Sequence, residues 1–304
     1  MSTFLVTGGC GFIGSHLCDA LLAGGHSVRV LDDLSSGKRG NLSPQASLIE
    51  GSVTDAPLMR QALDGVAGCF HLAAIASVER GMREWLPTHR TNLGGTVTLF
   101  DAIVGLGQRI PVVYASSAAV YGEPASLPLE EGAAKRPVSA YGADKYGSEL
   151  HATVASIAHG IPTVGLRFFN IYGPRQDPHS PYSGVVAIFA ERLRHGRPIT
   201  MYGDGGQTRD FVFVADAVRA LLAAMAASPP GGQVFNVCTG VGVSVRELAR
   251  ELGAILGVSP EILPAPARGG EIRHSVGAPA RGRQALGLAE PMPIREGLSR
   301  LLSG

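Results

Sequence analysis

Tyr141 and Lys145 are the pair of side chains in this sequence best placed for acid–base chemistry. They lie four residues apart in the segment YGADK, so on a helix both side chains face the same way. The chain has only three lysines, which makes a lysine at this spacing informative. A nearby ammonium lowers the pKa of a phenol from about 10 towards neutral pH, which predicts Tyr141 as a general acid or base. Ser117 follows a strand-like segment earlier in the chain, and its hydroxyl could share a substrate oxygen with Tyr141. The structural alternative is a Tyr–Lys pair on a helix surface and a serine in a turn.

A glycine-rich segment, GGCGFIG, lies between the first predicted strand and the first predicted helix. Gly8, Gly11 and Gly14 allow a tight turn whose backbone N–H groups approach a pyrophosphate. The next predicted strand ends in Asp32, where an acid accepts hydrogen bonds from ribose hydroxyls and repels a 2′-phosphate. The order of these features predicts binding of NAD rather than NADP, although the basic residues 38–39 weaken that choice. The alternative is a glycine-rich turn that serves only to reverse the chain.

The elements that must position these residues follow an alternating pattern. Short apolar segments separated by helical patterns predict βαβ units and a parallel sheet that is buried on both faces. The predicted strands are residues 4–7, 27–31, 47–50, 68–72, 111–115 and 163–169. The predicted helices are residues 12–22, 56–63, 91–104, 141–159, 185–195, 216–227, 245–256 and 294–302. We expect an α/β fold with a Rossmann-type doubly wound parallel sheet and a smaller α/β substrate-binding domain. Residues 1–170 form the predicted NAD-binding domain and residues 171–304 the substrate domain, with part of 210–240 returning to the first.

Composition excludes several classes of function. The net charge of +1 gives no overall field that attracts nucleic acid or an anionic membrane. No apolar segment has the roughly 18 residues of a membrane span. The four cysteines are widely spaced, which is typical of reduced thiols and predicts a cytoplasmic protein. The nine histidines show no metal-ligand spacing, so we expect no metal site.

Several segments together resemble one known family. GGCGFIG, HLAA, SSAAVYG, YGADK and RFFNIYGPR resemble the extended short-chain dehydrogenase/reductases, and within them the UDP-glucose 4-epimerases and close UDP-hexose 4-epimerases. The similarity continues through QTRDFVFVAD and RGGEIRHS. It implies tightly held NAD, a UDP-sugar substrate, and a homodimer that pairs through the helices at 91–104 and 141–159. One departure is Ser52, where relatives usually carry an Asp near the adenine.

The resemblance also assigns residues. The implied catalytic residues are Ser117, Tyr141 and Lys145. The implied cofactor ligands are Gly8, Gly11, Phe12, Ile13, Gly14, Asp32, Leu72, Ala73, Ala74, Asn92, Tyr141, Lys145 and Phe169. The implied substrate ligands are Ser117, Asn170, Arg209, Arg268 and Glu271, and Ser275 lies where relatives restricted to non-acetylated sugars carry a bulky aromatic residue.

The residues after Ser117 bear on the type of reaction. Relatives that dehydrate or decarboxylate their sugar carry carboxylates there, whereas this chain has Ala118 and Ala119. The resemblance therefore favours epimerisation at carbon 4 through a 4-keto intermediate. Asp177 would repel a substrate carboxylate, which favours a neutral hexose over glucuronate, and the small Ser275 leaves room for an N-acetyl group. The alternatives are a UDP-glucuronate epimerase or decarboxylase, a dTDP-sugar dehydratase or reductase, and a non-catalytic NAD-binding regulator.

Overall fold

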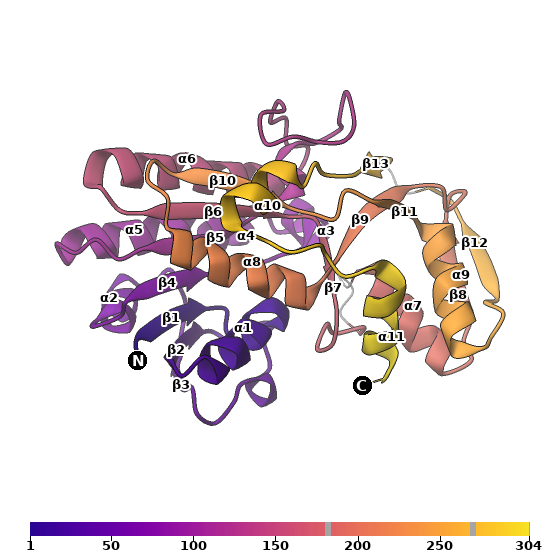
Figure 1. The fold of residues 1–304 in the computed structure, drawn as a ribbon, viewed down its shortest axis with the longest axis horizontal. Helices are drawn as coiled ribbons and strands as arrows, with labels where there is room; N and C mark the ends of the chain where they lie inside the picture. The colour runs from indigo at the N-terminus through magenta and orange to yellow at the C-terminus, as the bar shows by residue number, and fades with distance from the viewer. Residues whose placement is uncertain (180–183, 268–271, 304) are drawn as a thin grey trace.

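The chain forms a large parallel β-sheet covered by helices on both faces, with a smaller group of strands and helices beside it (Figure 1). The computed structural model describes residues 1–179, 184–267 and 272–303. The strands of the large sheet lie in the order β10-β6-β5-β4-β1-β2-β3, and neighbouring strands are parallel. They are β1 (Thr3–Thr7), β2 (Ser27–Asp32), β3 (Ser47–Glu50), β4 (Gly68–His71), β5 (Val112–Ser117), β6 (Thr163–Phe168) and β10 (Gln233–Val237). The strand order reverses between β1 and β4, which is where ligands bind in doubly wound sheets. The predicted fold class is confirmed.

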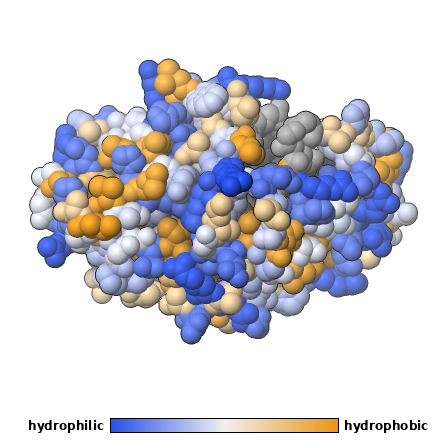
Figure 2. All heavy atoms as spheres, turned by 90° about the horizontal axis from the view of Figure 1, so that it is seen from above, coloured by the Kyte–Doolittle hydropathy of each residue, from blue (hydrophilic) through white to orange (hydrophobic). Residues whose placement is uncertain are grey.

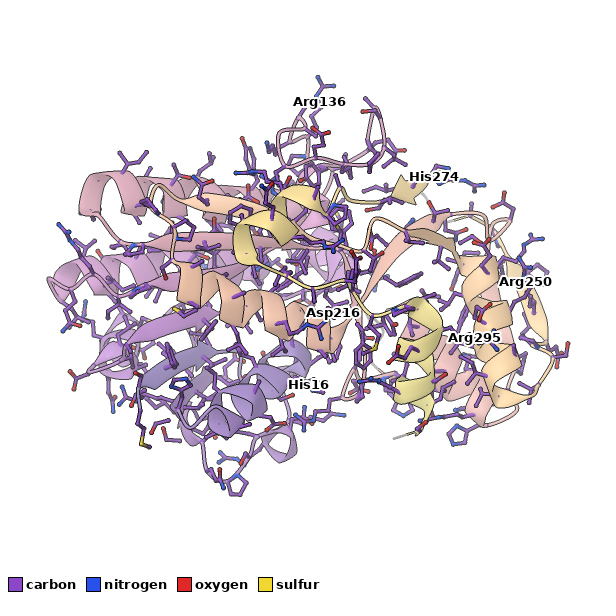
Figure 3. All side chains as sticks on the ribbon, viewed as in Figure 1. His16, Arg136, Asp216, Arg250, His274 and Arg295 are labelled. Atoms are coloured by element: carbon purple, nitrogen blue, oxygen red, sulfur yellow. The ribbon has the colours of Figure 1, made fainter. Side chains whose placement is uncertain are left out.

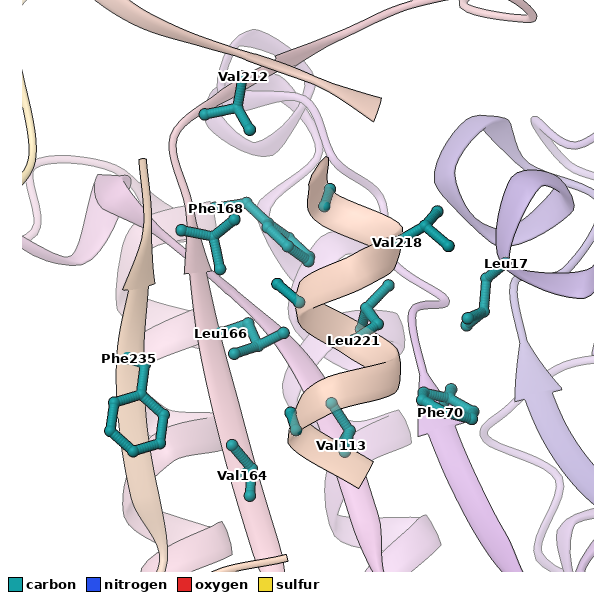
Figure 4. Close-up of a cluster of buried hydrophobic side chains, with 14 of the residues drawn as sticks. Leu17, Phe70, Val113, Val164, Leu166, Phe168, Val212, Val218, Leu221 and Phe235 are labelled. Carbon is teal, nitrogen blue, oxygen red and sulfur yellow. The ribbon is translucent and has the colours of Figure 1, made fainter. Parts of the chain in front are cut away.

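Helices cover both faces of this sheet because its strands are apolar on both sides. On one face lie α1 (Phe12–Ala23), α8 (Val214–Ala227) and α10 (Ala280–Leu286), and on the other lie α2 (Ala56–Leu63), α5 (Gly95–Gly105) and α6 (Ala140–His159). Figure 4 shows Val218 and Leu221 of α8 in one buried cluster with Leu17 of α1 and with Val113, Leu166 and Phe168 of the sheet. The carboxyl ends of the strands are thereby held in fixed positions.

The second group of strands is organised around β9 (Thr208–Phe213). This strand pairs with β7 (Asn170–Tyr172), β11 (Gly242–Ser244) and β13 (His274–Ser275), while β8 (Ile199–Tyr202) pairs separately with β12 (Ile262–Ala265). The helices α7 (Val185–Arg194), α9 (Val245–Leu256) and α11 (Ile294–Ser303) contribute to a common apolar core with these strands. The chain then returns to the first group, because β10 pairs with β6 at the edge of the large sheet.

The helix that carries Tyr141 and Lys145 has well-defined ends. The Ser139 hydroxyl oxygen accepts a hydrogen bond from the backbone N–H of Gly142 (3.1 Å) and begins α6, and Gly160 ends it in a left-handed conformation. Before α5 the chain forms α3 (Val78–Arg83), α4 (Trp85–His89) and a π-helical turn (Arg90–Gly94). The helix predicted to begin at residue 91 therefore begins at residue 85. Pro87 lies in the first turn of this helix, where its missing N–H costs nothing.

Two short 3₁₀ turns complete the chain: η1 (Arg39–Asn41), after β2, and η3 (Ala118–Val120), directly after β5.

Candidate active site

The glycine-rich segment forms a turn between β1 and α1 in which two positions have no room for a side chain. Gly8 has a φ of +71°, and a Cβ atom there would lie 2.8 Å from the backbone nitrogen of Ala73. A Cβ atom at Gly14 would overlap the carbonyl oxygen of Gly8. The N–H of Gly11 donates to the same carbonyl (3.1 Å) and closes the turn. The result is a cradle of bare backbone, as a pyrophosphate site requires.

The amino terminus of α1 faces this cradle with free donors. Gly11 occupies the cap position, no side chain in the described part of the chain caps the helix, and the first turn carries no acidic residue. The first N–H groups of a helix have no intrahelical partner, so those of Phe12 and Ile13 can bind an anion, and the helix dipole adds to this attraction. These residues fit the predicted cofactor site.

Asp32 ends β2 and is buried beside the turn. Its Oδ2 accepts a hydrogen bond from the backbone N–H of Cys10, and its Oδ1 accepts one from that of Leu34, both at 2.9 Å. Burial raises the pKa of Asp32, and these two bonds oppose that effect. The carboxylate therefore fixes the glycine turn, and lone pairs remain on it for ribose hydroxyls.

Thr7, at the end of β1, is a positioning residue that the sequence analysis missed. Its Oγ1 accepts hydrogen bonds from the backbone N–H groups of Leu72 and Ala73, both at 3.2 Å, and bonds to Nδ1 of His71 at 2.9 Å. Burial, with a smaller effect of the Lys145 ammonium, lowers the pKa of His71 to about 3, so this ring is neutral. A polar residue at the end of a buried strand, just before the glycine turn, was the signal that could have revealed this role.

Two further predicted cofactor residues have their own structural bonds. Asn92 is buried, accepts a hydrogen bond from the N–H of Ile75 (2.8 Å) and donates one to its carbonyl (3.2 Å), which fixes the segment after Ala74. Phe169 is buried at the end of β6, where its N–H donates to the carbonyl of Val237 (3.2 Å). Phe169 directly follows β6, and Asn92 holds the segment that follows β4, so both lie on the side of the sheet where its strands end.

The three predicted catalytic residues meet at this edge of the sheet. Ser117, at the end of β5, lies beside Tyr141, in the first turn of α6, and its hydroxyl lowers the pKa of the phenol. Lys145 Nζ lies 5.8 Å from the centre of the Tyr141 ring and donates to the carbonyl oxygen of Ala115 (2.8 Å). A phenol, an alcohol and an ammonium group are thus gathered as the spacing predicted.

The electrostatics of this group differ from the prediction. Burial raises the pKa of Tyr141, and the bond from Ser117 opposes this, whereas Lys145 is not among the main causes. Lys145 is itself buried, which lowers its pKa to about 8, and its ammonium bonds to a backbone carbonyl rather than to the phenol. The predicted lowering of the Tyr141 pKa by Lys145 is therefore wrong for this structure.

Three predicted substrate residues lie on paired strands. Ser275 of β13 is opposite Arg209 of β9, and the exposed Asn170 begins β7, where it is opposite Phe211 of the same β9. The guanidinium of Arg209 donates to the backbone carbonyl of Thr208 (2.9 Å). The structure thus brings Asn170, Arg209 and Ser275 into one small sheet. Arg268 and Glu271 lie outside the described residues.

Asp177 does not have the role that its charge suggested. Its Oδ2 forms an ion pair with Lys38 Nζ at 2.8 Å, and this bond lowers the pKa of Asp177. Because the ammonium compensates the carboxylate, Asp177 gives no argument against a substrate that carries a carboxylate. The expected repulsion of a substrate carboxylate by Asp177 is therefore not supported.

The part of the chain that the structure describes forms neither a metal site nor a helix that could span a membrane. Within residues 1–179, 184–267 and 272–303, no group of three or more His, Cys, Asp or Glu side chains could hold a metal ion. Figure 3 shows two of the histidines, His16 on α1 and His274 on β13, well apart in the fold. Among the helices described, none is long and apolar enough to cross a membrane.

Comparison with known proteins decides the family. Residues 4–238 match the NAD dependent epimerase/dehydratase family. The chain belongs to this family. The UDP-glucose 4-epimerase of Mycolicibacterium smegmatis is 39% identical, over 97% of this chain and 96% of its own. Less similar relatives include a UDP-N-acetyl-alpha-D-glucosaminuronate decarboxylase from Bacillus cytotoxicus.

Solved structures agree over nearly the whole fold. The UDP-glucose 4-epimerase of Thermotoga maritima, solved with UDP-glucose, is 37% identical and superposes with a TM-score of 0.95, covering 99% of this chain and 97% of its own. A UDP-N-acetylglucosamine 4-epimerase of Methanobrevibacter ruminantium is 32% identical with a TM-score of 0.94 and the same coverages, 99% and 97%. The predicted resemblance is confirmed: the chain is an NAD-dependent nucleotide-sugar epimerase, and NAD is its cofactor.

Proposed function

We propose that this enzyme interconverts UDP-hexoses at carbon 4, with Ser117, Tyr141 and Lys145 as its catalytic residues. The observation that carries the proposal is the grouping of Ser117, Tyr141 and Lys145 at the carboxyl edge of the sheet, followed by the 3₁₀ turn at Ala118–Val120. Ala118 and Ala119 supply no carboxylate for moving a second proton. The group is sufficient for removing and returning one proton at one hydroxyl, which is the minimal chemistry of an epimerase.

The roles of the residues follow from their chemistry. NAD, which the glycine turn and Asp32 would hold, would supply the acceptor for a hydride from carbon 4 of the hexose and the donor for its return to the opposite face. Tyr141 takes the proton of the 4-hydroxyl and gives it back, while Ser117 orients the same oxygen. Lys145, held by the carbonyl of Ala115, lies beside the phenol, where the resemblance implies that it also bonds the nicotinamide ribose.

The substrate must be anchored at its nucleotide so that the hexose can turn between the two hydride transfers. Arg209 suits this task because a guanidinium can form two parallel hydrogen bonds to phosphate oxygens. Asn170, on the neighbouring β7, is exposed and can add an amide contact. The resemblance adds Arg268 and Glu271. In this proposal residues 1–170 mainly bind NAD, and residues 171–304 mainly bind the nucleotide sugar.

We propose that both plain and N-acetylated hexoses fit. Ser275 is a small side chain on β13 in register with Arg209, so it leaves volume beside the anchored diphosphate. Replacing Ser275→Tyr should reduce turnover of UDP-N-acetylglucosamine about tenfold or more by filling that volume, with little change for UDP-glucose. An equal loss for both sugars, measured as kcat/KM, would contradict this part of the proposal.

The decisive experiment is product analysis. The protein, supplied with NAD, is incubated separately with UDP-glucose, UDP-N-acetylglucosamine and UDP-glucuronate, and the products are separated by chromatography. The expected result is the galacto isomer of the neutral sugars without net NADH. Loss of carbon dioxide or of water would instead support a decarboxylase or a dehydratase, and the absence of any product would support an NAD-binding regulator.

We also propose a homodimer that pairs through α5 and α6. Large apolar side chains are exposed on both helices: Val97, Val104, Leu150, Val154 and Ile157. Apolar residues gather at the end of the molecule where these helices lie, on the left in Figure 2. Covering such a surface with a second copy removes it from water. Sedimentation of wild type and of Ile157→Asp, which places a charge in the patch, should show a dimer and a monomer respectively.

The four buried, free cysteines support a cytoplasmic location.

A further inference from the structure

One face of α6 carries three side chains that are spaced one helical turn apart: Tyr141, Lys145 and Glu149. Each of these side chains is next to one of the last three residues of β5, which are Ala115, Ser116 and Ser117. Lys145 Nζ donates to the carbonyl of Ala115 (2.8 Å), the Ser116 hydroxyl donates to Glu149 Oε1 (2.5 Å), and Ser117 lies beside Tyr141 and lowers its pKa. The helix with the acid–base residue is thus joined to the strand with the catalytic serine through three successive contacts.

Glu149 is itself fixed from the next strand. It forms a two-point ion pair with Arg167 of β6, with Nε to Oε1 at 2.8 Å and Nη2 to Oε2 at 2.7 Å. Both side chains are about 95% buried, with exposed fractions of 5% and 4%. The remaining donor of Arg167, Nη1, bonds to the hydroxyl of Tyr121 (2.8 Å) and to the carbonyl of Glu131 (2.9 Å). The guanidinium also stacks on the Tyr121 ring, so neither partner of the pair can change rotamer without breaking several bonds.

A buried ion pair is costly to desolvate and adds little to stability compared with apolar residues of the same volume. Its value lies in fixed geometry. Here Oε1 of Glu149 also accepts a hydrogen bond from the hydroxyl of Ser116, the residue directly before Ser117. We propose that Glu149, held by Arg167, is a positioning residue that keeps Ser117 at bonding distance from Tyr141. This inference rests on the proposed roles of Ser117 and Tyr141 in epimerisation, and it adds the pair that sets their mutual geometry.

The consequence is measurable because the Ser117 bond lowers the pKa of Tyr141 against the effect of burial. Loosening β5 weakens that bond, so the pKa of Tyr141 rises. Lys145 Nζ lies 5.8 Å from the centre of the Tyr141 ring, and the Lys145 ammonium also acts on His71. The other described charged or titratable side chains on this end of α6 and on the helices packed against it are Arg80, Arg83, Glu84, His89, Arg90, Asp101, Asp144 and Tyr146.

Ser116→Ala is the variant that tests the proposal. It removes the bond to Glu149 but leaves the Glu149–Arg167 ion pair intact, so it creates no unpaired buried charge. Glu149→Gln would leave the Arg167 guanidinium without its anion and threatens folding. The matched control is Thr163→Val, which removes another buried hydrogen bond between the sheet and α6, from Thr163 Oγ1 to the carbonyl of Ala152 (3.1 Å), far along the helix from Tyr141.

The measurement is the titration of Tyr141 in the NAD-loaded protein by NMR of ¹³Cζ-labelled tyrosine, with the Tyr141 signal assigned by its loss in Tyr141→Phe. We expect Ser116→Ala to raise the pKa of Tyr141 by about 0.5 or more, and Thr163→Val to leave it unchanged although both lose similar thermal stability. In turnover of UDP-glucose, Ser116→Ala should lower kcat about tenfold with little change in KM, and the acidic limb of the pH profile should move to higher pH.

Two results would overturn the inference: a Tyr141 titration in Ser116→Ala equal to that of wild type, or an equal shift in Thr163→Val. Because the titration needs no turnover, it gives an answer even if the wild type fails to epimerise UDP-glucose. That failure would contradict the proposed function and not the geometry.

Discussion

The two halves of the site are built differently. At the carboxyl edge of the large sheet, Lys145 and Glu149 are buried and bonded to β5, so the catalytic group sits on fixed supports. On the small sheet around β9, Asn170 is exposed and Ser275 partly exposed, on strands of three and two residues. One region is rigid through buried polar bonds, and the other is short-stranded and open to solvent.

This difference suits the two tasks. Hydride and proton transfer need atoms held within a fraction of an ångström, which buried and fully bonded side chains provide. Binding a nucleotide sugar whose ring must turn needs strong contacts at the phosphates and few at the hexose. Changes in the first region should therefore affect kcat, and changes in the second should affect KM.

The largest effect should come from Tyr141→Phe. This change removes the phenolic oxygen that accepts the proton, and general acid–base groups contribute about 10² to 10⁴ in rate. We expect kcat for UDP-glucose to fall by about 10³ with NAD still bound, measured by a coupled assay and by cofactor content after purification. Turnover close to that of wild type would remove Tyr141 from its catalytic role.

The next effect concerns the cofactor. In Gly14→Ala the new methyl group would overlap the carbonyl of Gly8, so the turn must shift away from the pyrophosphate. Such backbone strain costs about 1–3 kcal/mol, which predicts NAD affinity lower by about tenfold to a hundredfold. Calorimetric titration with NAD measures it. Gly40→Ala is the control, since a Cβ atom at Gly40 would have nothing within 4 Å.

Arg209→Ala should show the contrast between the regions most directly. Loss of a charged hydrogen bond to phosphate costs about 1.5–3 kcal/mol, so KM for UDP-glucose should rise about tenfold or more with kcat nearly unchanged. Steady-state kinetics test this. A fall in kcat with unchanged KM would mean that β9 takes part in the chemical step and that the comparison is wrong.

The smallest effect is on stability. Burial lowers the pKa of Lys145 from 10.5 to about 8, so the folded state loses this proton at lower pH than the unfolded chain does. Between those values the unfolded chain binds more protons, and the stability contributed by Lys145 rises with pH. Below pH 8 Lys145 is charged in both the folded and the unfolded state, so the folded state bears the full desolvation cost of the buried ammonium. Lys145→Met should therefore gain thermal stability relative to wild type near pH 7, and the gain should shrink towards pH 10, as measured by scanning calorimetry.

Much of the fold followed from local patterns because strand and helix periodicities are strong in the first half. The glycine-rich segment, Asp32 and the spacing of Tyr141 and Lys145 predicted which edge of the sheet carries the site. What sequence alone did not reveal was which partner each charge finds in space. Asp177 pairs with Lys38, from a segment far earlier in the chain, and Lys145 bonds to a backbone carbonyl. Pairings of this kind depend on tertiary distances that no spacing along the chain encodes.

The Glu149–Arg167 pair had a sequence signal that was not used. Glu149 follows Lys145 by one helical turn, so it lies on the same face of the helix as Tyr141. An acidic residue on the buried side of a helix requires a cation, and Arg167, the residue before the last in the buried strand β6, was the candidate.

The return of the chain to the large sheet has a consequence for dissecting the protein. β10 covers the outer edge of β6, and it arrives only after α7, β8, β9 and α8 have been made. A fragment cut after residue 170 would retain the glycine turn but leave a row of unpaired amide and carbonyl groups along β6. Exposed edges of this kind recruit other chains and aggregate. The half that holds the nucleotide cofactor is therefore not a detachable module. Its sheet can be completed only after the ribosome has made β10.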